Sequence, residues 1–246
     1  MQELKKQLEV LLAGYFRECC ADFPKGKMEA SESPDFIVKL KNSHRLGIEL
    51  VRLNPGSADV PDEHEAEQNV ILEELIDDAR ELFEQNSEVK LFVKFLFNKK
   101  HPPSPERSLV TAAKAVNAIR NSIRNKKPGN LFYHVIPKEQ LPEGLDEILV
   151  AHHPGLEASV WERSNNLGIS KNVIHDILKS IEKKEEKLRL YKKQRLESYW
   201  LLITTDRLRG QRNYNIRNQI ANHNFQSDFE CVFLFDLFRS HVFRLV

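Results

Sequence analysis

The stretch SPDFIVKLKNSHRLGIELVRL, residues 33–53, contains two short apolar runs that each carry one acidic residue. Asp35 follows a proline and opens the first run, and Glu49 lies among aliphatic residues in the second. A carboxylate inside an otherwise apolar strand is costly unless it is paired or holds a cation. Two such carboxylates on neighbouring strands predict a metal site.

The two apolar runs predict a β-hairpin. Residues 36–40 and 46–51 are rich in β-branched and aliphatic side chains, and the polar residues between them are typical of a turn. Because side chains alternate across a strand, Asp35 shares a face with Lys39. If the strand register brings the faces of Asp35 and Glu49 to the same side, the two carboxylates converge. Hard oxygen ligands of this kind suit Mg²⁺ or Mn²⁺, with waters completing the coordination.

Both acids also have simpler interpretations. Asp35 can start a strand while its side chain caps a turn. Glu49 can pair with Lys39 across the hairpin, because cross-strand ion pairs are common. The sequence leaves these alternatives open beside the metal site.

Composition predicts a soluble globular protein of 246 residues, with 41% apolar and 30% charged residues. No run of eighteen apolar residues occurs, so we expect no membrane partner. Residues 1–20 mix acids and bases and predict an amphipathic helix rather than a signal peptide. The three cysteines, Cys19, Cys20 and Cys231, have no zinc-binding spacing, which favours a reducing cytoplasm.

Charge is strongly segregated although the net charge is only +1. Residues 99–127 contain eight basic and one acidic residue, and residues 171–217 contain thirteen basic and six acidic residues. Such stretches fit a phosphate-rich partner, the DNA backbone, although solvated helix faces explain them equally well. The candidate nucleic-acid contacts within them are Lys114, Arg120, Arg124, Lys184 and Tyr191.

Hydrophobic periodicity predicts alternating helices and strands along the chain. Expected helices cover residues 2–21, 62–86, a basic segment ending near 124, 170–198 and 211–222. Beyond the hairpin, expected strands cover residues 89–97, 131–135, 148–151, 159–161, 199–204, 229–235 and 242–246. This order predicts an α/β or α+β layered fold, with a central mixed β-sheet flanked by helices.

The pattern Pro34-Asp35, thirteen residues, then Glu49-Leu50-Val51 resembles the PD-(D/E)XK nuclease superfamily, which has a restriction-endonuclease-like fold. The helix before the hairpin, the helix and strand that come after it, and the later charged helix followed by a buried strand are similar to that family, over about half of the chain. The resemblance implies one nuclease-like domain over residues 1–246, with an insertion at about 99–168. It also implies hydrolysis of phosphodiester bonds in DNA, with Asp35 and Glu49 holding Mg²⁺ or Mn²⁺.

The chain departs from the family at Val51, where the family has a lysine that activates water or stabilises charge at the phosphate. Lys39 is one replacement, because it shares a strand face with Asp35. Lys187 is another, because its spacing from Tyr191 is similar to a helical motif in an exonuclease branch of the family. The resemblance also makes Glu18, on the first helix, a candidate third metal ligand.

A second function class stays open because of Val51. The same fold without catalysis would act as a nucleic-acid-binding or protein-interaction module, and a homodimer would fit the near-neutral net charge. The sequence contains no HExxH motif, no Cys/His cluster, no P-loop and no G-x-S-x-G motif. Zinc hydrolases, nucleoside triphosphatases and serine hydrolases therefore lack their usual signals.

Overall fold

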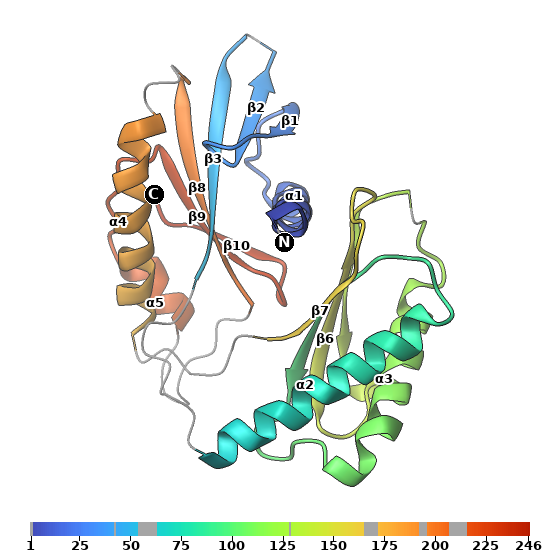
Figure 1. Ribbon diagram of the computed structural model, residues 1–246. Coiled ribbons are helices and arrows are strands. Elements are labelled where there is room, and N and C mark those ends of the chain that lie inside the picture. The colour runs from blue at the N-terminus through green and yellow to red at the C-terminus, as the bar shows by residue number, and fades with distance from the viewer. Residues whose placement is uncertain are drawn as a thin grey trace. The chain divides into compact units, whose positions relative to one another are not determined.

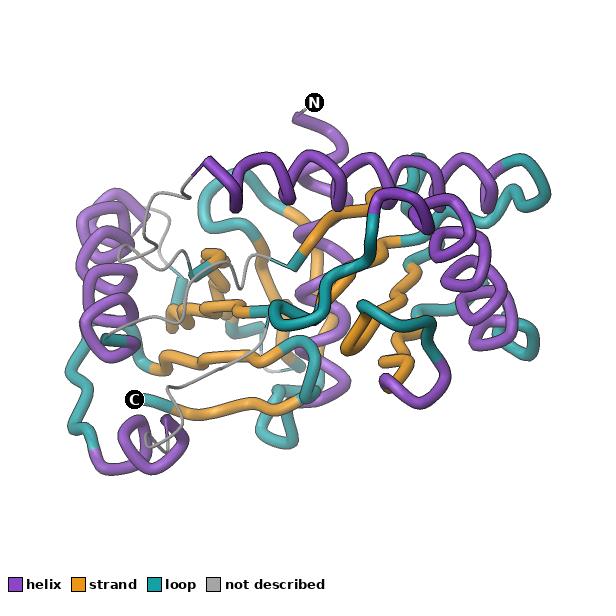
Figure 2. The backbone as a smooth tube through the Cα atoms, turned by 90° about the horizontal axis from the view of Figure 1, so that it is seen from below, coloured by secondary structure: helices purple, strands orange, loops and turns teal. Residues whose placement is uncertain are grey.

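The computed structural model describes residues 2–41, 43–53, 63–127, 129–164, 172–191, 196–206 and 216–246. Within these ranges the chain forms five α-helices and ten strands, and the strands lie in two mixed sheets (Figures 1 and 2). The expected class of helices layered on mixed β-sheet is thereby confirmed. None of the helices in these ranges is long and apolar enough to cross a membrane.

The chain divides into two compact units. Unit 1 comprises Met1–Tyr15 and Asp59–Asn165, and unit 2 comprises Phe16–Ala58 and Asn166–Val246. The segment of unit 1 that interrupts unit 2 is longer than the insertion expected at about 99–168. It also includes the helix expected at 62–86 and the strand expected at 89–97. The sequence could not assign these two elements to a unit, because an apolar pattern shows that a segment is buried but not which segment it pairs with.

Unit 2 contains a six-stranded sheet in the order β1-β2-β3-β8-β9-β10. The strands β1, β2 and β3 are antiparallel, β3, β8 and β9 are parallel to one another, and β10 is antiparallel to β9. The strand bounds are β1 Gly26–Ala30, β2 Phe36–Leu40, β3 Arg45–Arg52, β8 Ser198–Thr205, β9 Cys231–Asp236 and β10 His241–Arg244.

Helices cover both faces of this sheet. On one face, α4 (Val173–Tyr191) and α5 (Ile216–Asn222) pack against Leu201 and its neighbours in one apolar cluster. On the other face lies the end of α1 (Gln2–Cys19), where the Phe16 ring is 5.3 Å from that of Phe233.

Unit 1 contains a four-stranded sheet in the order β5-β6-β4-β7. The helices α2 and α3 pack on it through apolar side chains such as Phe83 and Ile119, which join Val93 and Phe95 of β4 in one cluster. The bounds are α2 Glu63–Glu84, β4 Phe92–Phe97, α3 Ser108–Ile123, β5 Phe132–Pro137, β6 Leu145–His152 and β7 Val160–Arg163, with short 3₁₀ helices at Pro105–Arg107 and Lys138–Gln140.

The sequence did not predict β1. Its residues, GKMEA, are largely polar, because β1 is an edge strand that pairs only with β2. Lys27 and Glu29 on this strand form an ion pair at 3.1 Å on its surface. An edge strand needs no apolar run, so hydrophobicity alone gives no signal for it.

Candidate functional site

The register of the β2–β3 hairpin brings the two acids of the predicted site together. Phe36 pairs with Ile48 and Ile37 pairs with Gly47, and the same spacing continued one residue beyond β2 puts Asp35 level with Glu49. Cross-strand neighbours share a face of the sheet. The register of the hairpin is therefore compatible with the metal prediction, and the metal site itself stays a prediction.

Asp35 is tied to β3 by its side chain. Its Oδ2 accepts a hydrogen bond of 2.8 Å from the backbone N–H of Leu50. Because β2 begins at Phe36, the carboxylate of Asp35 supplies the acceptor just beyond the last ladder pair. This bond crosses the hairpin and is therefore not the turn cap that the sequence had left open, but it fixes the orientation of the carboxylate.

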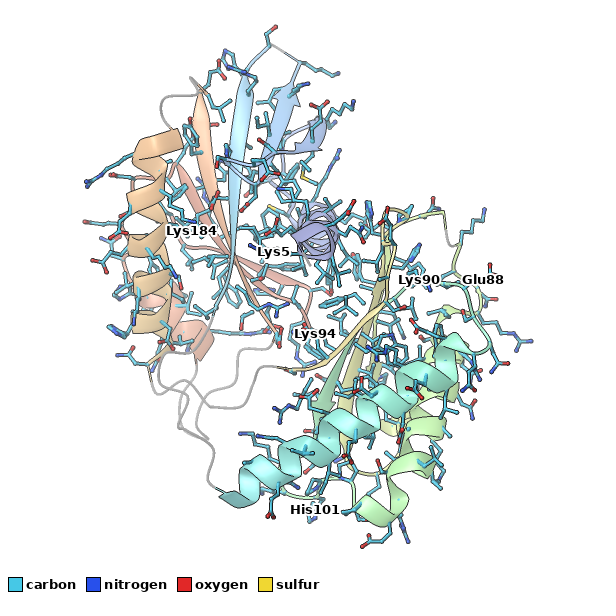
Figure 3. All side chains as sticks on the ribbon, in the orientation of Figure 1. Lys5, Glu88, Lys90, Lys94, His101 and Lys184 are labelled. Carbon is cyan, nitrogen blue, oxygen red and sulfur yellow. The ribbon has the colours of Figure 1, made fainter. Side chains whose placement is uncertain are left out.

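Glu49 is 4% exposed and lies on the α4 face of the sheet, since it pairs in register with Leu201. Its Oε1 accepts a hydrogen bond of 2.6 Å from Nζ of Lys184 on α4. The same ammonium donates a bond of 3.0 Å to the carbonyl oxygen of Leu50. In Figure 3, Lys184 lies on the side of α4 that faces the sheet. Helix and sheet are thus joined through one nearly buried cation.

The helical repeat explains why Lys184 reaches the sheet. The buried apolar side chains of α4 are spaced at helical intervals and form one stripe: Val173, Ile177, Ile181 and Leu188. Lys184 occupies the next position of this stripe, three residues after Ile181 and four before Leu188. From the sequence, Lys184 was predicted to contact the phosphate backbone of DNA. The signal that it missed was a charged residue at a position where the stripe predicts an apolar one.

Gly47 permits the close packing beside the two acids. A Cβ atom at this position would lie 2.7 Å from Cγ of Pro34 and 2.9 Å from Cδ1 of Leu196. Real Cβ atoms do not approach other atoms so closely, so any side chain would push Pro34 away. Because Pro34 precedes Asp35, the small residue at Gly47 helps to hold Asp35 against β3.

The two lysines predicted as replacements for Val51 lie elsewhere in unit 2. Lys39 is 56% exposed and its ammonium contacts Glu29 at 2.6 Å. Lys187 is on α4 and is exposed. Lys184 is the lysine that the structure places against Glu49.

Glu18, the predicted third ligand, is not brought to the two acids. It is exposed on α1, whose end packs on the sheet face opposite to that of Glu49. The helix and its acid could be predicted from the sequence, but the face of the sheet that the end of the helix covers could not.

The predicted nucleic-acid contacts are divided between the two units. Lys114 and Arg124 are exposed at α3 in unit 1. Arg120 is half-buried, and its Nη2 donates a bond of 2.7 Å to the carbonyl oxygen of Leu82, so it links α3 to α2. Lys184 lies in unit 2 at the site just described. The side chain of Tyr191 lies outside the described residues.

The oxygens at this site are of the type that Mg²⁺ binds. Oε1 of Glu49 and the carbonyl oxygen of Leu50 both lie within 3.0 Å of one cationic nitrogen, and Asp35 is bonded to the same residue, Leu50. In the described part of the chain, no group of three or more His, Cys, Asp or Glu side chains could hold a metal ion. An ion here would therefore keep several waters, as Mg²⁺ commonly does. With those waters, Glu49 Oε1 and the Leu50 carbonyl oxygen form a donor set that fits Mg²⁺ or Mn²⁺.

A cavity of about 490 Å³ lies beside α4 in unit 2. It is lined by His175, Leu178, Lys179, Ile181, Glu182, Glu185 and Gln226. Neither acid of the site nor Lys184 is among the lining residues. The site is thus a nearly buried cluster at the helix–sheet contact, distinct from this cavity.

Comparison with known proteins found no matching family model, no matching curated protein and no matching solved structure. The functional argument accordingly depends on the geometry of the chain itself.

Proposed function

We propose that the chain is a divalent-metal-dependent, nuclease-like protein that hydrolyses phosphodiester bonds in DNA. The observation that supports this most directly is the cross-strand placement of Asp35 beside Glu49, with the Lys184 ammonium 2.6 Å from Glu49. Two carboxylates and one lysine are the residue types that the resemblance to PD-(D/E)XK nucleases requires.

The order of elements in unit 2 also supports the proposal. The end of α1 is followed by three antiparallel strands, then by α4 and by β8, which is parallel to β3. The resemblance described this same succession of helix, hairpin, helix and strand. This order supports the assignment of Asp35 and Glu49 as the two acids of that pattern.

Each residue of the site has a distinct role in this proposal. Glu49 and the Leu50 carbonyl would hold Mg²⁺ or Mn²⁺, and the bond from Leu50 N–H keeps Asp35 beside them. The bound ion would lower the pKa of a coordinated water and offset negative charge on the phosphate. Lys184 provides the positive charge near the phosphate that Val51 cannot supply.

Binding to DNA would use the exposed basic side chains. Lys114 and Arg124 in unit 1 are such residues, and contacts of this kind with phosphates are largely independent of sequence. The three cysteines Cys19, Cys20 and Cys231, which have no zinc-binding spacing, support a reducing cytoplasm as the compartment.

A specific observation favours a second function, a catalytically inactive nuclease fold that binds nucleic acid or protein. Glu49 is nearly buried and already ion-paired with Lys184, and Asp35 already accepts a backbone hydrogen bond. The described cavity of unit 2 does not include them. In this alternative the three residues stabilise the fold, and Val51 marks the loss of catalysis.

A cleavage assay separates the two functions. Plasmid and single-stranded DNA are incubated with the wild-type chain, Asp35→Asn and Glu49→Gln, each with Mg²⁺ or Mn²⁺. We expect each substitution to lower the cleavage rate by at least about a hundredfold, because each removes negative charge that holds the ion. Glu186→Gln is a matched control, since Glu186 is an exposed acid on α4. Absence of cleavage by the wild type with either ion would favour the inactive module.

A further inference from the structure

We propose that the Lys184 ammonium and a divalent ion are alternative occupants of one position, bounded by Glu49 Oε1 and the Leu50 carbonyl oxygen. This is called the cation position below. The inference rests on the proposed function and adds a form of regulation to the same site. The divalent ion binds only when Lys184 withdraws, and the withdrawn ammonium then becomes available to a phosphate.

The geometry of the ammonium carries the first step. Nζ of Lys184 lies 2.6 Å from Glu49 Oε1 and 3.0 Å from the Leu50 carbonyl oxygen, so it bridges oxygens of two consecutive residues. Mg²⁺ binds oxygen at about 2.0–2.1 Å. An ion bonded to both oxygens would therefore occupy the space that the ammonium fills. Steric overlap and repulsion between two positive charges exclude joint occupancy.

The exposure of the two partners identifies which one moves. The side chain of Glu49 is 5% exposed and extends from a central strand of the sheet. Lys184 is 12% exposed and carries its charge on a flexible four-carbon chain. Withdrawal of the ammonium needs only rotations of that chain. Movement of Glu49 would require a change in β3.

The sequence of α4 also supports a mobile Lys184 and a fixed Glu49. The residues three and four positions away from Lys184 are Ser180, Ile181, Lys187 and Leu188, none of which is acidic. Lys184 therefore has no carboxylate at the spacing that stabilises ion pairs within a helix. Once displaced from the cation position, the ammonium is open to an incoming anion, and a phosphate bound to the ion would supply that charge.

Metal binding tests the inference without any use of cleavage. Isothermal titration calorimetry with Mn²⁺ compares the wild type, Lys184→Met, Lys184→Arg and Lys183→Met. Methionine keeps the approximate length of lysine but lacks its charge, so we expect Lys184→Met to bind Mn²⁺ at least about tenfold more tightly than the wild type. Lys183→Met is the matched control, because Lys183 is exposed on α4 and has the neighbouring position. It and Lys184→Arg should bind as the wild type does.

Two further measurements make the test decisive. The double variant Glu49→Gln with Lys184→Met should lose the gained affinity, because the carboxylate that holds the ion is gone. If Lys184→Met alone is unfolded, millimolar Mn²⁺ should restore its near-ultraviolet circular dichroism, since the ion replaces the missing charge. Equal or weaker binding of Mn²⁺ by folded Lys184→Met, or failure of Mn²⁺ to restore the fold, would overturn the inference.

The outcome can be distinguished from failure of the proposed function. Tighter Mn²⁺ binding by Lys184→Met, together with no DNA cleavage by the wild type, supports the exchange of cations and contradicts the nuclease. Cleavage that depends on Asp35 and Glu49, with no gain in Mn²⁺ affinity in Lys184→Met, supports the nuclease and contradicts the exchange.

Discussion

Among the described residues, each unit contains a lysine–glutamate pair in which one partner is at most 5% exposed, and the two pairs differ in which partner that is. In unit 2, Lys184 contacts Glu49 at 2.6 Å, and the acid is the more buried residue, at 5% exposure against 12%. In unit 1, Lys94 contacts Glu162 at 3.0 Å, and the lysine is fully buried while the acid is 28% exposed. A buried charge that cannot reach water depends most on its partner.

The two pairs also arise from different parts of the fold. Lys94 and Glu162 face each other in the parallel ladder of β4 and β7, so the strand register alone fixes their contact. Lys184 reaches Glu49 from a helix and also contacts the backbone of β3. A cross-strand pair is fixed by the sheet, whereas a helical lysine can leave a strand acid by rotation of its own side chain, as the proposed exchange requires.

The largest effect is expected in unit 1. Glu162→Gln should lower the free energy of unfolding by about 3–5 kcal/mol, because it removes the carboxylate beside a fully buried ammonium. Urea unfolding monitored by Trp161 fluorescence, with Trp200→Phe as background, measures the change in unit 1. Lys94→Met removes the buried charge itself and should cost about 1 kcal/mol or less. A greater loss in Lys94→Met than in Glu162→Gln would contradict the comparison.

In unit 2 the order of the two substitutions should be reversed. Lys184→Met should lower the free energy of unfolding by about 3 kcal/mol in the absence of divalent ions, because Glu49 stays buried with its charge. Glu49→Gln should lower it by about 1 kcal/mol, since the Lys184 ammonium can move to water. Unfolding is monitored by Trp200 fluorescence in a Trp161→Phe background. Equal losses of unfolding free energy in the two variants would show that neither Glu49 nor Lys184 depends on the other to stay out of water.

The sequence predicted the elements of the fold better than their pairing. Apolar runs identified β3, β4, β8 and β9, because a strand covered on both faces needs continuous apolar residues. They could not assign the strands to two sheets, since burial of a strand does not specify its neighbour. Polar β1 gave no apolar signal at all.

The site was predictable in part. Alternation along the hairpin placed Asp35 and Glu49 on one face once the register was granted, and the ladder has that register. The contact with Lys184 depends on how α4 rotates and docks on the sheet, which local patterns do not fix. Lys184 was nevertheless recognisable in the sequence as a charged residue in the apolar stripe of α4. This feature favours Lys184 over Lys187 as the lysine that contacts the sheet.

A glycine in each unit provides a smaller test of local packing. Gly47→Ala should lower the free energy of unfolding by about 1–2 kcal/mol, because its Cβ would overlap Pro34 and Leu196. Gly129→Ala in unit 1 is the control, since no atom lies within 4 Å of a Cβ built there. Urea unfolding of both variants gives the comparison. A Gly47→Ala chain as stable as the wild type would show that Pro34 and Asp35 are loosely held.

The smallest effect concerns pH, and it should affect unit 1 before unit 2. In unit 1, burial and then the charge of His152 lower the pKa of His153 from its usual 6.5, and its Nδ1 accepts a bond of 3.0 Å from Gly155 N–H. The unfolded chain therefore takes up the proton first. The contribution of His153 to stability is present above about pH 6.5 and is lost as the pH falls towards the lowered pKa.

An acid of unit 2 whose pKa is also lowered, Glu197, titrates at lower pH. The backbone N–H of Arg45 bonds to Glu197 at 2.7 Å and lowers the pKa of that carboxyl from its usual 4.5. The contribution of Glu197 is present above about pH 4.5 and is lost as the pH falls through the lowered pKa. Between pH 7 and 5, amide hydrogen exchange should therefore become faster in unit 1. The corresponding loss in the free energy of unfolding should be less than about 1 kcal/mol, because His153 is partly solvated. The exchange rate in unit 2 should stay constant over this range. Loss of protection in unit 2 at a higher pH than in unit 1 would contradict the assignment of the two pH ranges.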